Sequence, residues 1–237
     1  MRRWMMVLLV AGMGLVSGQV ARADEAATTR PTTAPATAPG QAKLPHLEVD
    51  VKKRQVRVEC QALNVEMPLE FFCVVKGTNE HESVLRSQVK PSQLHLALLM
   101  IGLKPGTPVH YDNATDKWYA PQGPPLHIWI EYQKDGKTVR YPAYRCMRNV
   151  KTKKEMPPLT WIFTGSRIME DGKYAADVTG YLVSVVNFDL TVIDIPEIAS
   201  SANETLEWEY NPKLVPKTGT RVTMILEPAD HVEKDGK

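Results

Sequence analysis

The chain lacks the patterns that mark metal clusters, phosphate loops and common catalytic sites. It has three cysteines among 237 residues and no C-x-x-C pair, and three thiolates cannot hold an all-cysteine iron–sulfur cluster. The metalloprotease pattern H-E-x-x-H begins at His81 but fails at Leu85, where a second zinc-binding histidine would stand. Neither a G-x-S-x-G motif nor a G-x-x-x-x-G-K-[ST] loop is present. We therefore expect no catalytic residue set, no metal site and no cofactor.

The chain also lacks a strong charge of either sign. The full sequence has 29 Lys and Arg against 27 Asp and Glu. Residues 1–23 contain three arginines and no acidic residue, so a chain that begins at Asp24 has 26 basic and 27 acidic side chains. A net charge near −1 argues against a nucleic-acid partner, because such partners require a basic surface.

The N-terminal segment has the features of a signal peptide. Arg2 and Arg3 precede an apolar run over residues 4–16, and Ala-Arg-Ala at 21–23 is an A-x-A cleavage site. The run is shorter than the roughly 20 residues that a membrane-spanning helix needs. We interpret residues 1–23 as a signal peptide that directs the protein to the periplasm or cell envelope. An uncleaved N-terminal anchor is the alternative.

The rest of the chain divides into a linker, one domain and a tail. Residues 24–43 contain three prolines among threonines and alanines. Such a composition cannot bury enough apolar surface to offset the entropy of ordering, so a disordered linker is expected. Residues 44–230 are long enough for a single globular domain, and residues 231–237 are expected to be a disordered tail.

The domain is dominated by the pattern of β-strands. Apolar and polar residues alternate with a period of two, which is typical of half-buried strands, over 47–51, 56–62, 126–132 and 222–226. Residues 134–137 include Gly136 and predict a hairpin turn. Further strands are expected over 69–75, 161–166, 181–186 and 189–193, and a turn at 170–173 leads into residues 174–177.

One helix is expected at about 91–102. Pro91 and Ser92 are typical of a helix start, and Gly102 followed by Pro105 is typical of a helix end. The residues between them are nearly all apolar, so we expect this helix to be buried at the centre of the core. The predicted fold class is α+β, with predominantly antiparallel β-hairpins packed on one buried helix.

A polar cluster follows the strand at 69–75. Lys76, His81 and Glu82 lie at a predicted junction between a strand and a helix, where exposed backbone N–H groups could bind a carboxylate or a phosphate. Alternatively, Glu82 is the acid of a capping box that begins at Asn79 and opens a short helix.

Two of the cysteines are candidates for a disulfide. Cys60 and Cys73 lie on two predicted strands, and an exported compartment permits a bridge between them if those strands pair. The alternative is a pair of buried free thiols.

Four parts of the domain resemble the YdjY domain family. They are LEFF at 69–72 with KGTNEHESVL at 76–85, PSQLHLALL at 91–99 with GLKPG at 102–106, WIFTGS at 161–166, and YAADVTG at 174–180. The resemblance as a whole extends over most of residues 47–226. The resemblance implies an exported bacterial protein but no particular reaction, and it favours Lys76, His81, Glu82 and His95 as ligand-binding residues.

We therefore expect an exported, β-rich module of the cell envelope that binds a ligand or a partner protein without catalysis. The alternative is a metal-dependent or hydrolytic envelope enzyme that uses His81, Glu82 and His95, which requires these three side chains to converge. A purely structural envelope component is a third interpretation.

Overall fold

The computed structural model describes residues 41–230. The predicted signal peptide, the tail at 231–237 and the linker up to residue 40 lie outside the described residues. The first strand, β1, spans Gln41–Leu44, so residues 41–43, which we assigned to the linker, belong to a strand. Within residues 41–230, no helix has the length and apolar character needed to cross a membrane.

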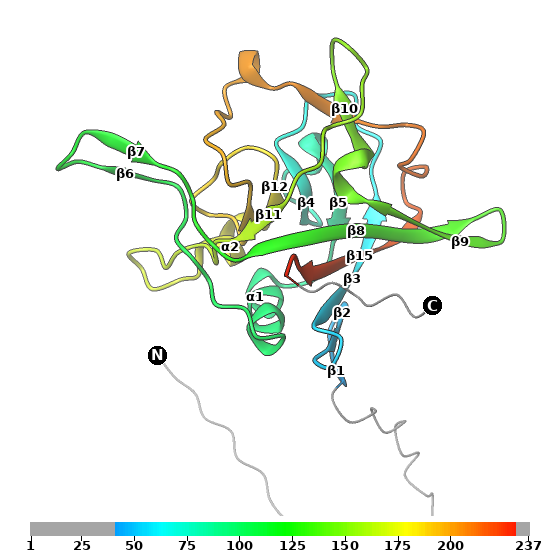
Figure 1. Ribbon diagram of the computed structural model, residues 1–237, viewed down its shortest axis with the longest axis horizontal. Helices are drawn as coiled ribbons and strands as arrows, with labels where there is room; N and C mark the ends of the chain where they lie inside the picture. The colour runs from blue at the N-terminus through cyan, green and yellow to red at the C-terminus, as the bar shows by residue number, and fades with distance from the viewer. Residues whose placement is uncertain (1–40, 231–237) are drawn as a thin grey trace, which may run out of the picture. The chain divides into compact units, whose positions relative to one another are not determined.

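The centre of the domain is a closed β-barrel of eight strands (Figure 1). Each strand is hydrogen-bonded to the next, and the pairing of β5 with β3 closes the ring. In order around the barrel the strands are β3 (Gln55–Ala62), β15 (Arg221–Pro228), β8 (Pro125–Lys134), β11 (Trp161–Phe163), β13 (Ile193–Asp194), β12 (Tyr181–Ser184), β4 (Phe71–Val75) and β5 (Ser83–Ser87).

The predicted fold class is therefore wrong. Hairpins do not pack on a central helix, because the strands close on themselves and their own inward side chains fill the interior. Two neighbouring pairs in the ring, β4–β5 and β12–β13, are parallel and so are not hairpins. Period-two alternation shows which side of a strand is buried, but it gives neither strand direction nor closure.

The alternating residues read from the sequence do line the core. On β3 the buried residues are Val56, Val58, Cys60 and Ala62, while Arg57, Glu59 and Gln61 face outward. The neighbouring strands β15 and β8 continue the inner face with Val222, Met224 and Leu226 and with Leu126, Ile128, Ile130 and Tyr132. The long β3, β15 and β8 thus form a continuous wall with one apolar face and one polar face.

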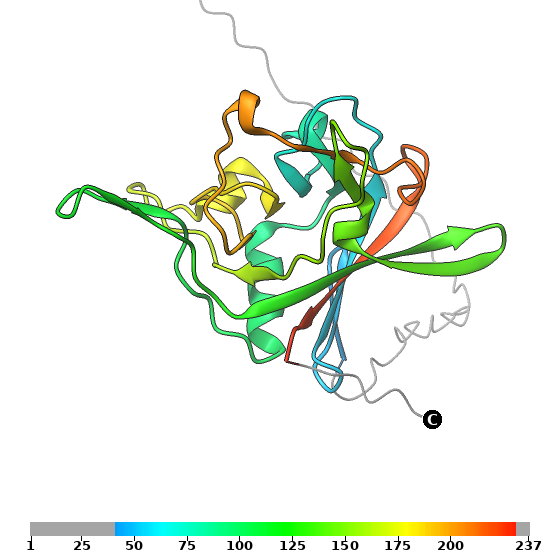
Figure 2. The same ribbon diagram turned by 45° about the horizontal axis from the view of Figure 1, so that its top comes forward.

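The remaining strands extend or flank the barrel. Strand β2 (Leu47–Asp50) pairs with β3 and carries β1 outside the ring, and β9 (Lys137–Pro142) pairs with β8 in the expected hairpin. Strand β10 (Met147–Asn149) pairs with β14 (Trp208–Tyr210). The hairpin of β6 (His110–Asp112) and β7 (Lys117–Tyr119) extends away from the barrel, as Figures 1 and 2 show.

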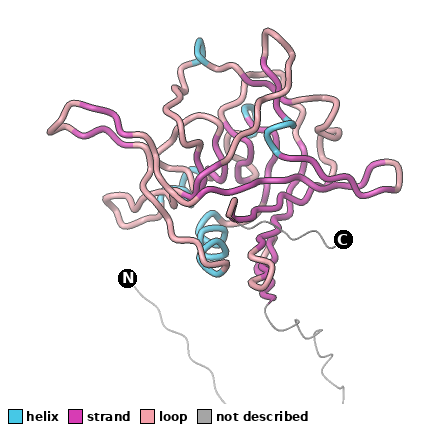
Figure 3. Tube along the Cα trace, in the orientation of Figure 1, coloured by secondary structure: helices cyan, strands magenta, loops and turns pink. Residues whose placement is uncertain are grey.

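Helices make up little of the described chain (Figure 3). They are α1 (Pro91–Met100), α2 (Ala175–Thr179), and the 3-10 helices η1 (Glu80–Glu82), η2 (Ala143–Cys146) and η3 (Asn203–Thr205). The short helix expected after Asn79 is only the single turn η1, followed by β5. Asn79 makes no capping hydrogen bond. The segment after the 170–173 turn forms α2.

Helix α1 is not buried on all sides. Its residues Leu94, Ala97 and Leu98 join the core, whereas Leu96 and Leu99 are 48% and 40% exposed. The helix packs against α2, β12 and β2. The apolar composition therefore identified the helix correctly, but part of its apolar surface forms the wall of a pocket.

Candidate functional site

A pocket of about 450 Å³ lies along the exposed side of α1. We call it the His95 pocket. Most of its lining comes from segments that the sequence resemblance included: α1 with the following turn at Pro105 and Gly106, residues 164–166, and Tyr174. Arg167 and Ile168, which follow the third of these motifs, complete it. The convergence of separate motif segments on one concave surface makes this pocket the leading candidate site.

The residues around α2 hold α1 in place. Asp177 accepts a hydrogen bond from the backbone N–H of Ser92 at 2.8 Å, and its other carboxylate oxygen lies 3.2 Å from Lys90 Nζ. A carboxylate at the first turn of a helix satisfies a free N–H and interacts favourably with the helix dipole. Asp177, the last residue of the sequence YAAD, therefore caps the N-terminus of α1 although it is distant from that helix in the sequence.

Gly165 allows the loop to approach the helix. Its φ of +86° is in the left-handed region, and a Cβ atom there would lie 2.5 Å from Pro105 Cβ and 3.1 Å from His95 Cε1. Only glycine combines that backbone conformation with so close a contact. The WIFTGS motif thus ends β11 and then brings its backbone against His95.

A chain of hydrogen bonds fixes the tautomer of His95. The Tyr174 hydroxyl donates to the Gly165 carbonyl at 2.9 Å, and it lies 2.9 Å from His95 Nδ1. Because that hydroxyl has already given its only proton, Nδ1 must be the donor to the tyrosine oxygen. The neutral ring therefore has its lone pair on Nε2.

His95 is partly exposed in the wall of this pocket. Its described hydrogen bonds involve the Tyr174 hydroxyl and the Gly165 backbone. Partial burial lowers the pKa of His95 below its usual 6.5, and the hydrogen bond with the Gly165 backbone opposes that shift. At neutral pH the ring is therefore uncharged, and its lone pair can accept a hydrogen bond.

Ser166 lines the same pocket but is not arranged as a nucleophile. Its φ of +57° is unusual for a residue other than glycine, and its hydroxyl donates to the Leu190 carbonyl at 2.8 Å. An activated serine would instead donate to a histidine. The unusual backbone conformation of Ser166 therefore serves the path of the loop and not a catalytic role.

The other predicted site residues lie elsewhere. The His95 pocket includes none of Lys76, His81 or Glu82. Lys76 follows β4 and lines a groove of about 520 Å³ on the outer surface of β3, β5, β15 and β8, together with Arg86 and Arg221. The structure thus places His95 in one concave surface and Lys76 in another.

His81 and Glu82 belong to a third cluster, which includes a residue that the sequence analysis missed. His81 Nε2 lies 3.7 Å from Glu82 Oε1. Burial, and then the charge and hydrogen bond of Glu82, raise the pKa of Glu70 to about 7. Burial and the two carboxylates also raise the pKa of Tyr181. Glu70 stands in the motif LEFF, but only the pairing of β4 with β5 brings it beside Glu82.

The sulfur atoms of Cys60 and Cys73 lie 3.9 Å apart as free thiols inside the barrel. Their strands are not neighbours, since β5 lies between β3 and β4. Burial and the Cys60 thiol raise the pKa of Cys73. The disulfide stays a prediction.

The structure also shows how His, Cys, Asp and Glu are distributed. Within residues 41–230, no three such side chains are grouped so that they could hold a metal ion.

Comparison with known proteins gives one match. The family model described as YdjY domain matches residues 47–227. No curated protein and no solved structure matches the chain.

Proposed function

The chain belongs to the YdjY domain family, and from that premise we propose that it is an exported module of the cell envelope that binds a ligand without catalysis in the His95 pocket. The suggested ligand is a neutral group with an apolar body and one N–H or O–H donor. The observation that carries the proposal is the position of His95, with its Nδ1 held by the Tyr174 hydroxyl, in the wall of a largely apolar pocket.

The walls of the pocket explain the choice of ligand. Leu96, Leu99, Pro105 and Ile168 supply apolar surface, and binding sites of this size combine apolar walls with a few placed polar groups. The lone pair on Nε2 accepts a hydrogen bond from an N–H or O–H donor and repels an anion. Export accords with the signal peptide pattern and with the family resemblance.

The test is an NMR titration of the ¹⁵N-labelled protein with N-acetyl-leucinamide and with N-acetyl-phenylalaninamide. We expect saturable shifts of the Gly165 and Ser166 amide signals. The change His95→Phe preserves the ring contacts with Phe163 and Tyr174 but removes the acceptor, and it should weaken binding at least fivefold.

The matched control is His127→Phe, which alters an exposed histidine on the outer face of β8 and should leave the affinity unchanged. Shifts confined to other parts of the barrel, or full affinity in His95→Phe, would contradict the proposed site. Export is tested separately, by identifying Asp24 as the N-terminus of protein recovered from a bacterial periplasm.

A further inference from the structure

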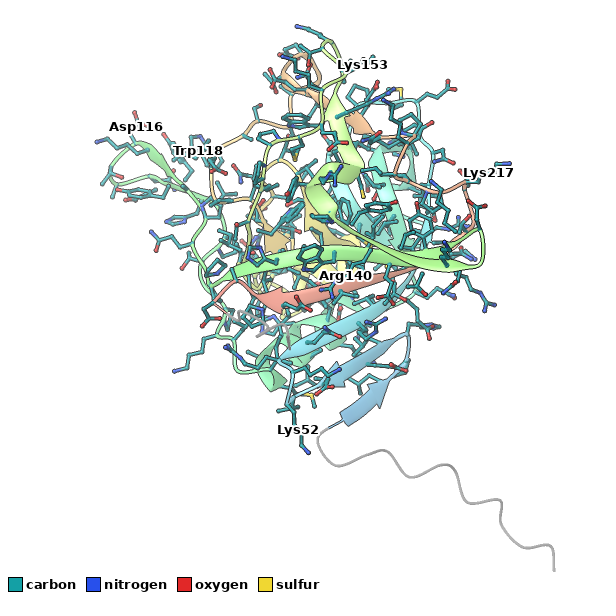
Figure 4. The ribbon with its side chains drawn as sticks, turned by 45° about the vertical axis from the view of Figure 1, so that its right-hand side comes forward. Lys52, Asp116, Trp118, Arg140, Lys153 and Lys217 are labelled. Atoms are coloured by element: carbon teal, nitrogen blue, oxygen red, sulfur yellow. The ribbon has the colours of Figure 1, made fainter. Side chains whose placement is uncertain are left out.

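A second pocket adjoins the His95 pocket. It has a volume of about 770 Å³ and lies between the β6–β7 hairpin and the loops at 187–189 and 198–201. We call it the hairpin pocket. Tyr111 and Trp118, which are paired across the hairpin with ring centroids 5.4 Å apart, form its aromatic wall. Figure 4 shows Trp118 on the projecting hairpin, away from the barrel core.

The exposed apolar side chains of the domain concentrate in these two pockets. The described chain has ten large hydrophobic side chains classed as exposed, and six of them line the two pockets. Leu96, Leu99 and Ile168 lie in the His95 pocket, and Tyr111, Trp118 and Ile198 lie in the hairpin pocket. Exposed apolar side chains that gather in pockets are typical of a binding site, whereas scattered single residues are not.

Arg167 joins the pockets, because it lines both of them. Its Nε donates to Asp189 Oδ2 at 2.6 Å, and both side chains are nearly half exposed. The guanidinium keeps further N–H donors, and the carboxylate keeps further acceptor sites. The junction of the two apolar pockets is thus a donor–acceptor pair.

We propose that the two pockets form one groove for an extended peptide, with an apolar side chain in each pocket and a peptide group at the Arg167–Asp189 pair. This inference rests on the proposed function. A peptide backbone supplies a carbonyl for the guanidinium and an N–H for the carboxylate. An acyl chain would cover the ion pair without replacing its water, which is costly.

The test measures the affinity of the full chain, and in parallel of the chain that begins at Asp24, for capped neutral peptides by fluorescence anisotropy. The peptides carry Leu and a labelled Phe separated by one to five Ser or Ala residues. One spacing should bind at least tenfold more tightly than N-acetyl-leucinamide. Ile168→Ser and Trp118→Ser should each weaken that peptide at least fivefold, and Arg167→Gln should weaken it threefold or more.

Val178→Ser is the matched control, because Val178 is exposed but lines neither pocket, and it should leave the affinity unchanged. Circular dichroism checks that each variant is folded. In the unsubstituted protein, the best peptide should also shift both the Trp118 indole N–H signal and the Ile168 amide signal.

Two results would overturn the groove while the proposed function stands: peptides that bind no more tightly than the single-residue amides, or peptide affinity that Trp118→Ser does not change. Tighter binding of decanol, with displacement of the peptide, would overturn the peptide class. If the amides also fail to bind at His95, the proposed function fails too.

Discussion

At the scale of single residues, Asp194 is the most unusual group in the core. Its Oδ1 accepts hydrogen bonds from Ser184 Oγ, Asn187 Nδ2 and the Ile195 amide, while Oδ2 is buried without a partner among the described residues. Burial raises the pKa of Asp194 to about 7, although hydrogen bonds from Ser184, Asn187 and the backbone N–H groups of Ile195 and Phe188 act in the opposite direction. A carboxyl in such surroundings exchanges a proton near neutral pH.

The raised pKa of Asp194 predicts how stability depends on pH. A carboxyl whose pKa is higher in the folded state stabilises the fold fully below its unfolded pKa of 3.8, and this stabilisation is lost as pH rises through about 7. Asp194→Asn does not titrate. Between pH 5 and pH 8 the unfolding free energy of the unsubstituted protein should therefore fall by on the order of 2 kcal/mol relative to this variant.

Urea unfolding at both pH values measures this difference. Asp194→Ala provides the contrast, because it leaves the donors to this carboxylate without their acceptor and should cost about 2–3 kcal/mol at either pH. A constant difference between the unsubstituted protein and Asp194→Asn across the pH range would show that Asp194 is not protonated near neutral pH.

The ligand affinity of the His95 pocket should also depend on pH. The pKa of His95 is below 6.5, so Nε2 keeps its lone pair at neutral pH and loses it as pH falls below that value. Binding of N-acetyl-leucinamide should be constant above pH 7 and should weaken progressively once pH falls through the lowered pKa of His95. Burial keeps Tyr174 protonated by raising its pKa above the usual 10.

His95→Phe should abolish this pH dependence, as followed by the Ser166 amide signal. If the weakening at low pH persists in that variant, another group is responsible.

Sequence reasoning at this scale found His95 but not its partners. The resemblance pointed to His95, yet Tyr174 lies 79 positions away along the chain and Glu70 contacts Glu82 only through a strand pairing. Spacing predicts such pairs within one helix or hairpin, where the geometry is fixed, but not between elements whose packing is unknown.

At the scale of elements, substitutions in α1 test whether the helix is buried on one side only. Leu98 is fully buried, whereas Leu96 is about half exposed two residues earlier. Leu98→Ala should lower the unfolding free energy by about 3 kcal/mol because it leaves a cavity, and Leu96→Ala should change it by less than about 0.5 kcal/mol. Chemical denaturation measures both changes. Equal losses of unfolding free energy would support the original prediction that the helix is buried on all sides.

The elements that the sequence predicted well are those whose signal is local. The hairpins around residues 51–54 and 134–137 have alternating strands and a turn between them. The connection from β4 to β5 was misread, because residues 76–82 contain a capping pattern. In the structure, Glu80 instead accepts from the Gly77 amide and from Arg86. Strands β4 and β5 are parallel and joined by a short connection. No pattern in the sequence distinguishes such a connection from the start of a helix.

At the scale of the whole molecule, β15 has a central position. It follows every other strand of the described chain, but it lies between β3 and β8 in the barrel wall. A chain that stops before Arg221 loses two strand pairings and the core residues Val222, Met224 and Leu226. We expect this truncated chain to show no cooperative unfolding transition by circular dichroism.

A chain that stops after Asp230 is the control, because it keeps β15 entirely, and it should unfold cooperatively like the full chain. A cooperative transition in the shorter chain would mean that β3 and β8 can pair without β15.

The place of β15 also governs when a newly made molecule becomes resistant to degradation. Until residues 221–228 have left the ribosome, β3 and β8 have no partner at this position, and their apolar sides are accessible to chaperones and proteases. A nascent polypeptide would therefore stay unfolded at least until this strand has emerged. Messages with a premature stop codon before this strand would yield products that are cleared rather than accumulated.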